Sequence, residues 1–132
     1  MSKLIDKLAW LRLEDGKILS TRSYGKDSYY IPGGKREGDE SDVDALSREI
    51  REELNVELVP ASIRHAGTFE AQAHGKAEGV TVRMTCYWAD YTGTLMPGAE
   101  IEEMVWLDYS GREKSSQVDK LIFDWLRDEG KL

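Results

Sequence analysis

The chain of 132 residues contains one cysteine, Cys86, and no stretch that approaches 18 consecutive apolar residues. A lone cysteine excludes a disulfide within the chain, which agrees with a reducing compartment, and we interpret Cys86 as a buried thiol. The absence of a long apolar run predicts no membrane-spanning helix, and residues 1–7 lack the apolar core of a signal peptide. We therefore expect a cytoplasmic protein.

Positive charge is also scarce, since 18 Lys and Arg residues face 25 Asp and Glu residues and give a net charge of −7. This balance argues against a stable nucleic-acid complex or an anionic-membrane surface, because both depend on basic side chains that neutralise phosphates. A phosphate ligand would instead arrive with a metal ion. Length, composition and the absence of internal repeats or linkers predict a single globular domain over residues 1–132, either monomeric or homodimeric.

The clearest local pattern is a helix that begins near Asp42. Ser41 and Asp44 have the spacing of a capping box, and Asn55 is suited to the left-handed residue on which helices often end. Spacings of three and four residues predict one buried stripe, formed by Val43, Leu46, Ile50 and Leu54.

The same helix places Glu49, Glu52 and Glu53 to one side of the apolar stripe, within about a third of the helix circumference at roughly 100° per residue. Like charges at these spacings repel, so helix stability alone does not favour the arrangement. A divalent cation would relieve the repulsion, and Mg²⁺ and Mn²⁺ prefer oxygen ligands. The alternative is a solvated acidic face balanced by Arg48 and Arg51.

The segment Gly34–Val56 resembles the Nudix box, G-x5-E-x7-R-E-U-x-E-E-x-G-U with U aliphatic. Every defined position matches except the last glycine, which is replaced by Asn55, a structurally mild change at a helix end. The preceding Tyr29–Gly34 resembles the aromatic lead-in to Pro-Gly-Gly that is common in the family. A second departure is Gly38-Asp39 in the loop, which leaves the acidic residues in register.

The resemblance implies an α/β fold, specifically a Nudix-type α/β/α sandwich with a mixed β-sheet. It also implies that Mg²⁺, with Mn²⁺ as a possible substitute, binds to Glu49, Glu52, Glu53 and the carbonyl group of Gly34. Glu52 and Glu53 are the strongest candidates for ligands or for water activation.

Two further residues complete the catalytic group that the resemblance implies. Arg48 would orient the carboxylates by ion pairing, supported by Glu40 at the start of the helix, and Glu100 would supply a further ligand or base. We considered His65 and His74 as bases and rank them below the carboxylates.

Four residues are candidates for substrate binding: Arg22, Tyr29, Gly33 and Lys35. Tyr29 could stack on a nucleobase or pack in the core, and Arg22 could reach a phosphate. The short chain favours hydrolysis of a nucleoside triphosphate, a deoxynucleoside triphosphate or a damaged form of either. The products would be the monophosphate and pyrophosphate. The alternatives are a nucleotide-sugar or dinucleotide pyrophosphatase, a non-catalytic nucleotide-binding module and a carbon-skeleton isomerase.

The remaining elements follow from alternation and turn signals. Lys7–Leu13 and Ile18–Arg22 are expected to pair as a hairpin. Further strands are expected in Val56–Val59, Ile63–Phe69, Val80–Tyr91 and the end of Glu100–Leu107, with a loop over Glu70–Gly79. Ser116 and Asp119 predict the cap of a closing helix with a buried stripe of Val118, Leu121, Ile122, Trp125 and Leu126.

Overall fold

The computed structural model describes residues 3–73 and 79–132, and these form nine strands, two α-helices and two 3-10 helices. The strands are β1 (Lys3–Trp10), β2 (Leu13–Glu14), β3 (Lys17–Ser23), β4 (Gly33–Gly34), β5 (Glu57–Leu58), β6 (Arg64–Gln72), β7 (Val80–Trp88), β8 (Tyr91–Thr92) and β9 (Ile101–Leu107). The helices are α1 (Asp42–Leu54), η1 (Pro60–Ser62), η2 (Tyr109–Lys114) and α2 (Gln117–Asp128).

The largest sheet is mixed and has the strand order β4-β1-β7-β6. β1 runs parallel to β7, and the pairs β1/β4 and β6/β7 are antiparallel. A second, antiparallel sheet has the order β2-β3-β9, and a small one joins β5 to β8. The mixed pairing agrees with the predicted fold class.

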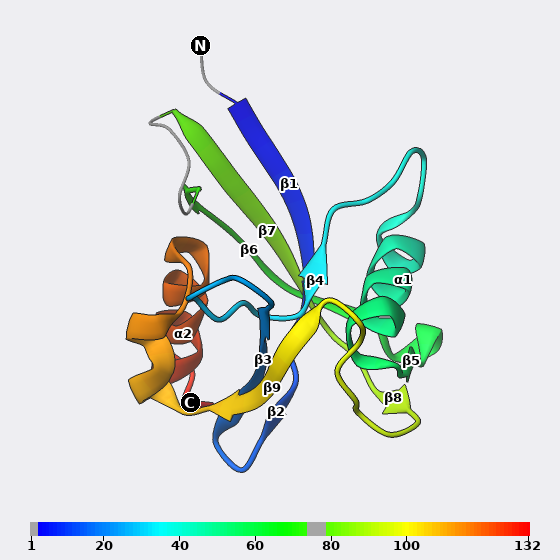
Figure 1. Ribbon diagram of the computed structural model, residues 1–132. Coiled ribbons are helices and arrows are strands. Elements are labelled where there is room, and N and C mark those ends of the chain that lie inside the picture. The colour runs from blue at the N-terminus through cyan, green and yellow to red at the C-terminus, as the bar shows by residue number, and fades with distance from the viewer. Residues whose placement is uncertain (1–2, 74–78) are drawn as a thin grey trace.

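The alternation of side chains along β1 builds two cores. Leu8 and Trp10 pack with the buried side chains of α1, whereas Ala9 packs with those of α2, including Phe123. Because successive side chains of a strand point to opposite faces, one buried strand can serve both helices. Figure 1 shows α1 and α2 on opposite sides of the strands. The protein is therefore the expected α/β/α sandwich.

α1 has the predicted ends and nearly the predicted buried face. The Ser41 hydroxyl accepts a hydrogen bond from the Asp44 amide at 3.1 Å, and Asn55 ends the helix with a left-handed φ of 59°. Its fully buried side chains are Ala45, Leu46, Ile50 and Leu54, while Val43 is only partly buried. These contacts fix the rotation of the helix and therefore the direction in which its glutamates point.

The predicted hairpin of Lys7–Leu13 with Ile18–Arg22 is confirmed only next to its turn, where Leu13 pairs with Ile18, and is wrong for the rest of its length. Only Leu13–Glu14 pairs with β3, whereas β1 pairs with β4 and β7. The chain leaves the large sheet after Trp10 and enters the second sheet at Leu13, which a pattern of alternation cannot reveal.

Three other predictions need adjustment. β6 continues to Gln72, so it occupies the start of the expected loop, and β7 ends at Trp88. In α2 the side chain of Leu121 is 41% exposed, and Phe123, which we had not assigned to the buried stripe, is fully buried.

No helix among the described residues has both the length and the apolar character needed to cross a membrane.

Candidate active site

The double glycine of the box forms β4 and lies between β1 and α1. Gly33 and Gly34 pair with Ala9 and Leu8 of β1. A Cβ atom on Gly33 would lie 1.9 Å from the carbonyl oxygen of Leu8, and one on Gly34 would lie 2.5 Å from the carboxyl group of Glu49. Only glycine fits at position 33, where the near atoms belong to the backbone, whereas a side chain at position 34 would displace the Glu49 carboxyl group.

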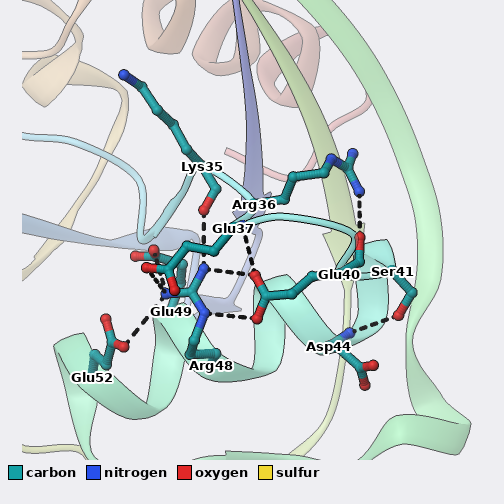
Figure 2. A network of polar contacts seen from close by, with 9 residues as sticks. All are labelled: Lys35, Arg36, Glu37, Glu40, Ser41, Asp44, Arg48, Glu49 and Glu52. Carbon is teal, nitrogen blue, oxygen red and sulfur yellow. Dashed lines mark hydrogen bonds and ion pairs between the residues drawn. The ribbon is translucent and has the colours of Figure 1, made fainter.

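Arg48 and Glu40 form the best-defined ion pair of the site, shown in Figure 2. The Nε and Nη2 atoms of Arg48 donate to the two carboxylate oxygens of Glu40 at 2.8 and 2.9 Å, and Nη2 also donates to the Lys35 carbonyl at 3.0 Å. This two-pronged contact stabilises the carboxylate and lowers the pKa of Glu40 to about 2. It ties the loop between β4 and α1 to the helix.

The other side of the Arg48 guanidinium faces the remaining glutamates. Its Nη1 atom lies 2.9 Å from Glu49, 3.4 Å from Glu52 and 3.5 Å from Glu37. The side chains of Arg48 and Glu49 are each 17% exposed, whereas that of Glu52 is 59% exposed. Arg48 therefore lies among the carboxylates as predicted, and of its two partners on α1 Glu52 is more open to a ligand from solvent than Glu49.

Glu53 lies deeper than the other glutamates of the box. Its Oε1 atom accepts a hydrogen bond from the Gly33 backbone N–H at 3.3 Å. The pKa of Glu53 is raised to about 8, mainly because burial removes the carboxyl group from water. The Gly33 N–H and Lys7 oppose this rise, and the nearby Glu49 adds to it. Burial likewise raises the pKa of Glu49. Carboxyl groups with a raised pKa are frequent at functional sites.

The donor atoms of this site fit a hard divalent cation, although the ligand set is not assembled in advance. Within the described ranges, no three carboxylate, imidazole or thiolate groups are arranged to enclose a metal ion. Glu49 and Glu52 each contact Arg48 through one carboxylate oxygen, Oε1, which leaves Oε2 of each side chain for an ion. Mg²⁺ usually keeps several waters and binds through a few carboxylates plus substrate phosphates, which does not require a closed cage.

A cavity of about 380 Å³ begins at β4 and runs between the large sheet and the start of α2. Its apolar lining comprises Ile5, Ile31, Ala73, Val82, Met84 and Val118. Its polar lining comprises Lys7, Thr21, Ser23, Lys26, Tyr30, Lys35, Glu53, Gln72 and Ser116, with Gly33 and Gly34 at the border. A cleft that combines apolar walls with polar groups is typical of small-molecule sites, and Glu53 places this one beside the box.

The predicted substrate residues divide between this cavity and a neighbouring cluster. Gly33 and Lys35 line the cavity. Arg22 instead pairs with Glu102 at 2.8 Å and Glu103 at 3.3 Å, and the Tyr29 hydroxyl donates to Glu103 at 2.7 Å.

The cavity is lined by the chain neighbours of Arg22 and Tyr29, namely Thr21, Ser23 and Tyr30. Successive residues of extended chain point to opposite sides, so Ser23 and Tyr30 line the cavity, whereas Arg22 and Tyr29 contact Glu103. A substrate-binding role for Arg22 and Tyr29 stays a prediction.

Glu100 is exposed and follows the loop that packs on the last turn of α1. The Gly98 N–H donates to the Glu53 carbonyl at 2.7 Å and the Met96 N–H to the Leu54 carbonyl at 3.0 Å. No hydrogen bond or ion pair joins the Glu100 side chain to the glutamates of α1 in the described part of the chain. The loop therefore reaches the site, and Glu100 stays a candidate for a further metal ligand or base.

The structure gives no support for His65 as a catalytic base. His65 lies on β6, where its ring contacts the Thr68 hydroxyl at 3.1 Å and meets the Tyr87 ring edge to face. His74 lies outside the described residues.

Sequence reasoning missed two charged residues beside the cavity. Lys7 lines it from β1, and Asp119 of α2 is fully buried, with Oδ2 accepting from the Ile31 N–H at 2.8 Å. Burial raises the pKa of Asp119 to about 7. One signal for Lys7 was present in the sequence, since a charged residue shares strand parity with the apolar Ala9 and Leu11.

Comparison with known proteins agrees with the fold and the box. The model of the NUDIX domain matches residues 7–126. The CTP pyrophosphohydrolase of Escherichia coli strain K12 is 31% identical over 109 residues, which cover 79% of this chain and 76% of the relative. The solution structure of the E. coli ORF135 protein has a TM-score of 0.73 at 27% identity and covers 96% of this chain and 92% of its own.

The structure of the MutT protein from Methanosarcina mazei Go1 has a TM-score of 0.77 at 20% identity and covers 99% of this chain and 98% of its own, so it supports the fold. The domain match spans most of the chain and includes the whole box, from Gly34 to Val56. The chain therefore belongs to the Nudix family and is a Nudix hydrolase.

Proposed function

We propose that this protein hydrolyses nucleoside triphosphates, or their deoxy forms, to the monophosphate and pyrophosphate, with Mg²⁺ or Mn²⁺ as the required ion. The observation that carries the proposal is the position of Glu53, which belongs both to the carboxylate group of α1 and to the wall of the 380 Å³ cavity. A nucleoside in the cavity would extend its phosphates toward the glutamates.

The proposed metal site consists of Glu49, Glu52, Glu53 and the carbonyl group of Gly34. A divalent ion at this site supplies charge neutralisation for a diphosphate and lowers the pKa of a bound water molecule. Glu52 is exposed enough to meet a ligand from solvent, while Glu53 faces the cavity border. The assignment matches the preference of these ions for oxygen donors.

Arg48 is proposed to position the carboxylates. It holds Glu40 with two hydrogen bonds and contacts Glu49 and Glu52 from the opposite edge of its guanidinium group. A planar, permanently charged group suits this role because it can hold several carboxylates in a fixed geometry. The N–H of Gly33 fixes Glu53 in the same way.

The small cavity favours a nucleoside over a larger group. Ligand cavities of a few hundred Å³ enclose molecules the size of a nucleoside, and the apolar walls suit the faces of a flat base. The enzyme named CTP pyrophosphohydrolase, 31% identical, makes a nucleoside triphosphate the first substrate to test.

The test is an assay of purified protein with a panel of nucleoside triphosphates, nucleotide sugars and dinucleotides, with Mg²⁺, with Mn²⁺ and with a chelator. Products would be identified by chromatography. Monophosphate plus pyrophosphate from a triphosphate, lost with chelator, supports the proposal. Monophosphate plus sugar phosphate as the preferred products would replace it by the nucleotide-sugar alternative, and an absence of turnover on every substrate would leave a binding module.

A further inference from the structure

Lys7 is a charged residue on an apolar face of the sheet. It lies between Ile5 and Ala9 on the side of β1 that packs toward α2, and its partner in register on β7 is Met84. Its ammonium lies 5.8 Å from the centre of the Tyr30 ring. Among the described residues no carboxylate comes within 4.0 Å of it, although Asp119, Glu53 and Glu49 act on it from further away.

The surroundings of Lys7 make its charge costly for the folded protein. Burial lowers the pKa of Lys7 despite the attraction of Asp119. A partly buried ammonium that contacts only the face of the Tyr30 ring, and no carboxylate among the described residues, is unfavourable, and an apolar residue would continue the pattern of Ile5 and Ala9 at lower cost. Departures from a local pattern that bring no structural gain tend to mark functional positions. Because Lys7 lines the cavity, the missing partner is most simply a ligand atom.

The position of Lys7 indicates which part of a nucleotide it meets. The glutamates that would receive the phosphates lie beyond Gly34, at one end of the cavity. Ile5, Val82 and Met84 form the apolar wall beside Lys7, while the charges of Asp119, Lys35, Glu53 and Glu49 act on it from further away. The apolar wall suits a base rather than a phosphate. An ammonium only donates hydrogen bonds, so it requires an acceptor on that base.

We infer that Lys7 selects the substrate by donating a hydrogen bond to a carbonyl oxygen of the nucleobase. This inference rests on the proposed function and narrows its substrate class. Cytosine, uracil, thymine and guanine each carry a ring carbonyl oxygen, whereas adenine has none and offers only ring nitrogens as acceptors, which lie in the ring and not beyond it. The enzyme therefore prefers CTP, UTP or GTP to ATP, and Lys7 is the residue that makes the difference.

The experiment compares wild type with Lys7→Met, which preserves length and fits an apolar face, and with Lys17→Met, which changes the exposed lysine at the start of β3. Steady-state kcat and KM are measured for CTP, UTP, GTP and ATP. Lys7→Met is expected to lower kcat/KM for the best carbonyl-bearing substrate by roughly 10- to 100-fold, mainly through KM, as for loss of a charge-assisted hydrogen bond. ATP should change by less than about threefold, and Lys17→Met should behave as wild type.

An equal loss for ATP and for the carbonyl-bearing substrates would overturn the inference, because it would place Lys7 on a phosphate or in a structural role. Unchanged kinetics would also overturn it. Circular dichroism and thermal unfolding establish that Lys7→Met is folded. If wild type hydrolyses no triphosphate, the proposed function fails, and Lys7 is still tested by calorimetric binding of CMP, UMP, GMP and AMP. Tighter binding of at least one carbonyl-bearing monophosphate than of AMP, lost in Lys7→Met, supports the inference, and equal binding refutes it.

Discussion

The Oε1 atom of Glu53 lies 3.3 Å from the backbone nitrogen of Gly33, so the end of the box helix is held against the start of the box loop. The two residues are 20 positions apart in the chain. This contact places a carboxyl group with a raised pKa at the border of the cavity. We therefore expect Glu53 and the residues that hold it to affect both catalysis and metal binding.

Replacement of Glu53 by Gln should reduce turnover by roughly 100- to 10,000-fold, because the amide keeps the shape of the side chain but cannot ionise to bind a metal ion or take up a proton. Folding should be retained, since the amide can still accept from Gly33. Titration of metal into wild type should raise the unfolding temperature, and this shift should be smaller in Glu53→Gln. Wild-type activity in the variant would remove Glu53 from the mechanism.

Arg48→Lys should lower kcat by roughly 10- to 100-fold, the range seen when residues that orient metal ligands are changed. Lysine keeps the charge but cannot donate both hydrogen bonds to Glu40 in one plane. Arg51→Lys is the matched control, because Arg51 holds Glu57 with a similar pair of bonds on the exposed side of α1. Equal effects of the two substitutions on activity would indicate a structural role for Arg48.

Gly34→Ala should lower activity by about 100-fold, since a displacement of about 1 Å in a reacting group can have this effect. The added methyl group would approach the Glu49 carboxyl group within 2.5 Å and push it aside. Gly67→Ala on β6 serves as the control, because its new contact is with the Phe69 ring at 3.1 Å. The unfolding temperature should fall little in either variant, and a globally unfolded Gly34→Ala protein would contradict this account.

Asp119 should make the folded protein less stable as pH rises. Its pKa is raised from an ordinary 3.8 to about 7, so between these values the folded state binds more protons than the unfolded state and the free energy of unfolding falls with pH. Asp119→Asn should remove this contribution, so its stability relative to wild type should increase from about pH 4 to about pH 7 and then level off.

Urea unfolding across this range, in the presence of chelator, measures the difference. Asp128→Asn, at the exposed end of α2, controls for the loss of a carboxylate elsewhere on the helix. A constant difference between Asp119→Asn and wild type at all pH values would show that Asp119 titrates normally.

Much of the site could be predicted from the sequence because its geometry is local. The cap at Ser41, the left-handed Asn55 and the buried stripe of α1 follow from spacings within one helix. Since the helical period fixes which side chains share a face, Glu49, Glu52 and Glu53 were correctly predicted to lie to one side of the buried stripe. The resemblance to the Nudix box added the fold.

The pairing of strands that are distant in the chain could not be predicted from the sequence. Nothing in the sequence of β1 indicates that it lies beside β7, more than 70 residues away, and so the hairpin was predicted to extend along β1, whereas it forms only at Leu13–Glu14. The phase of Arg22 and Tyr29 relative to the cavity also depended on sheets that form only in the folded chain. Strand alternation leaves open which of its two faces meets a ligand.

The sequence by itself determined the box helix, its caps and its acidic side, because neighbouring residues fix a helix through backbone geometry. Only the tertiary structure decided that Lys7 and Asp119 approach the same cavity and that Gly33 holds Glu53. These relationships join segments that are distant in the chain, and they exist because burial of the two cores brings the segments together.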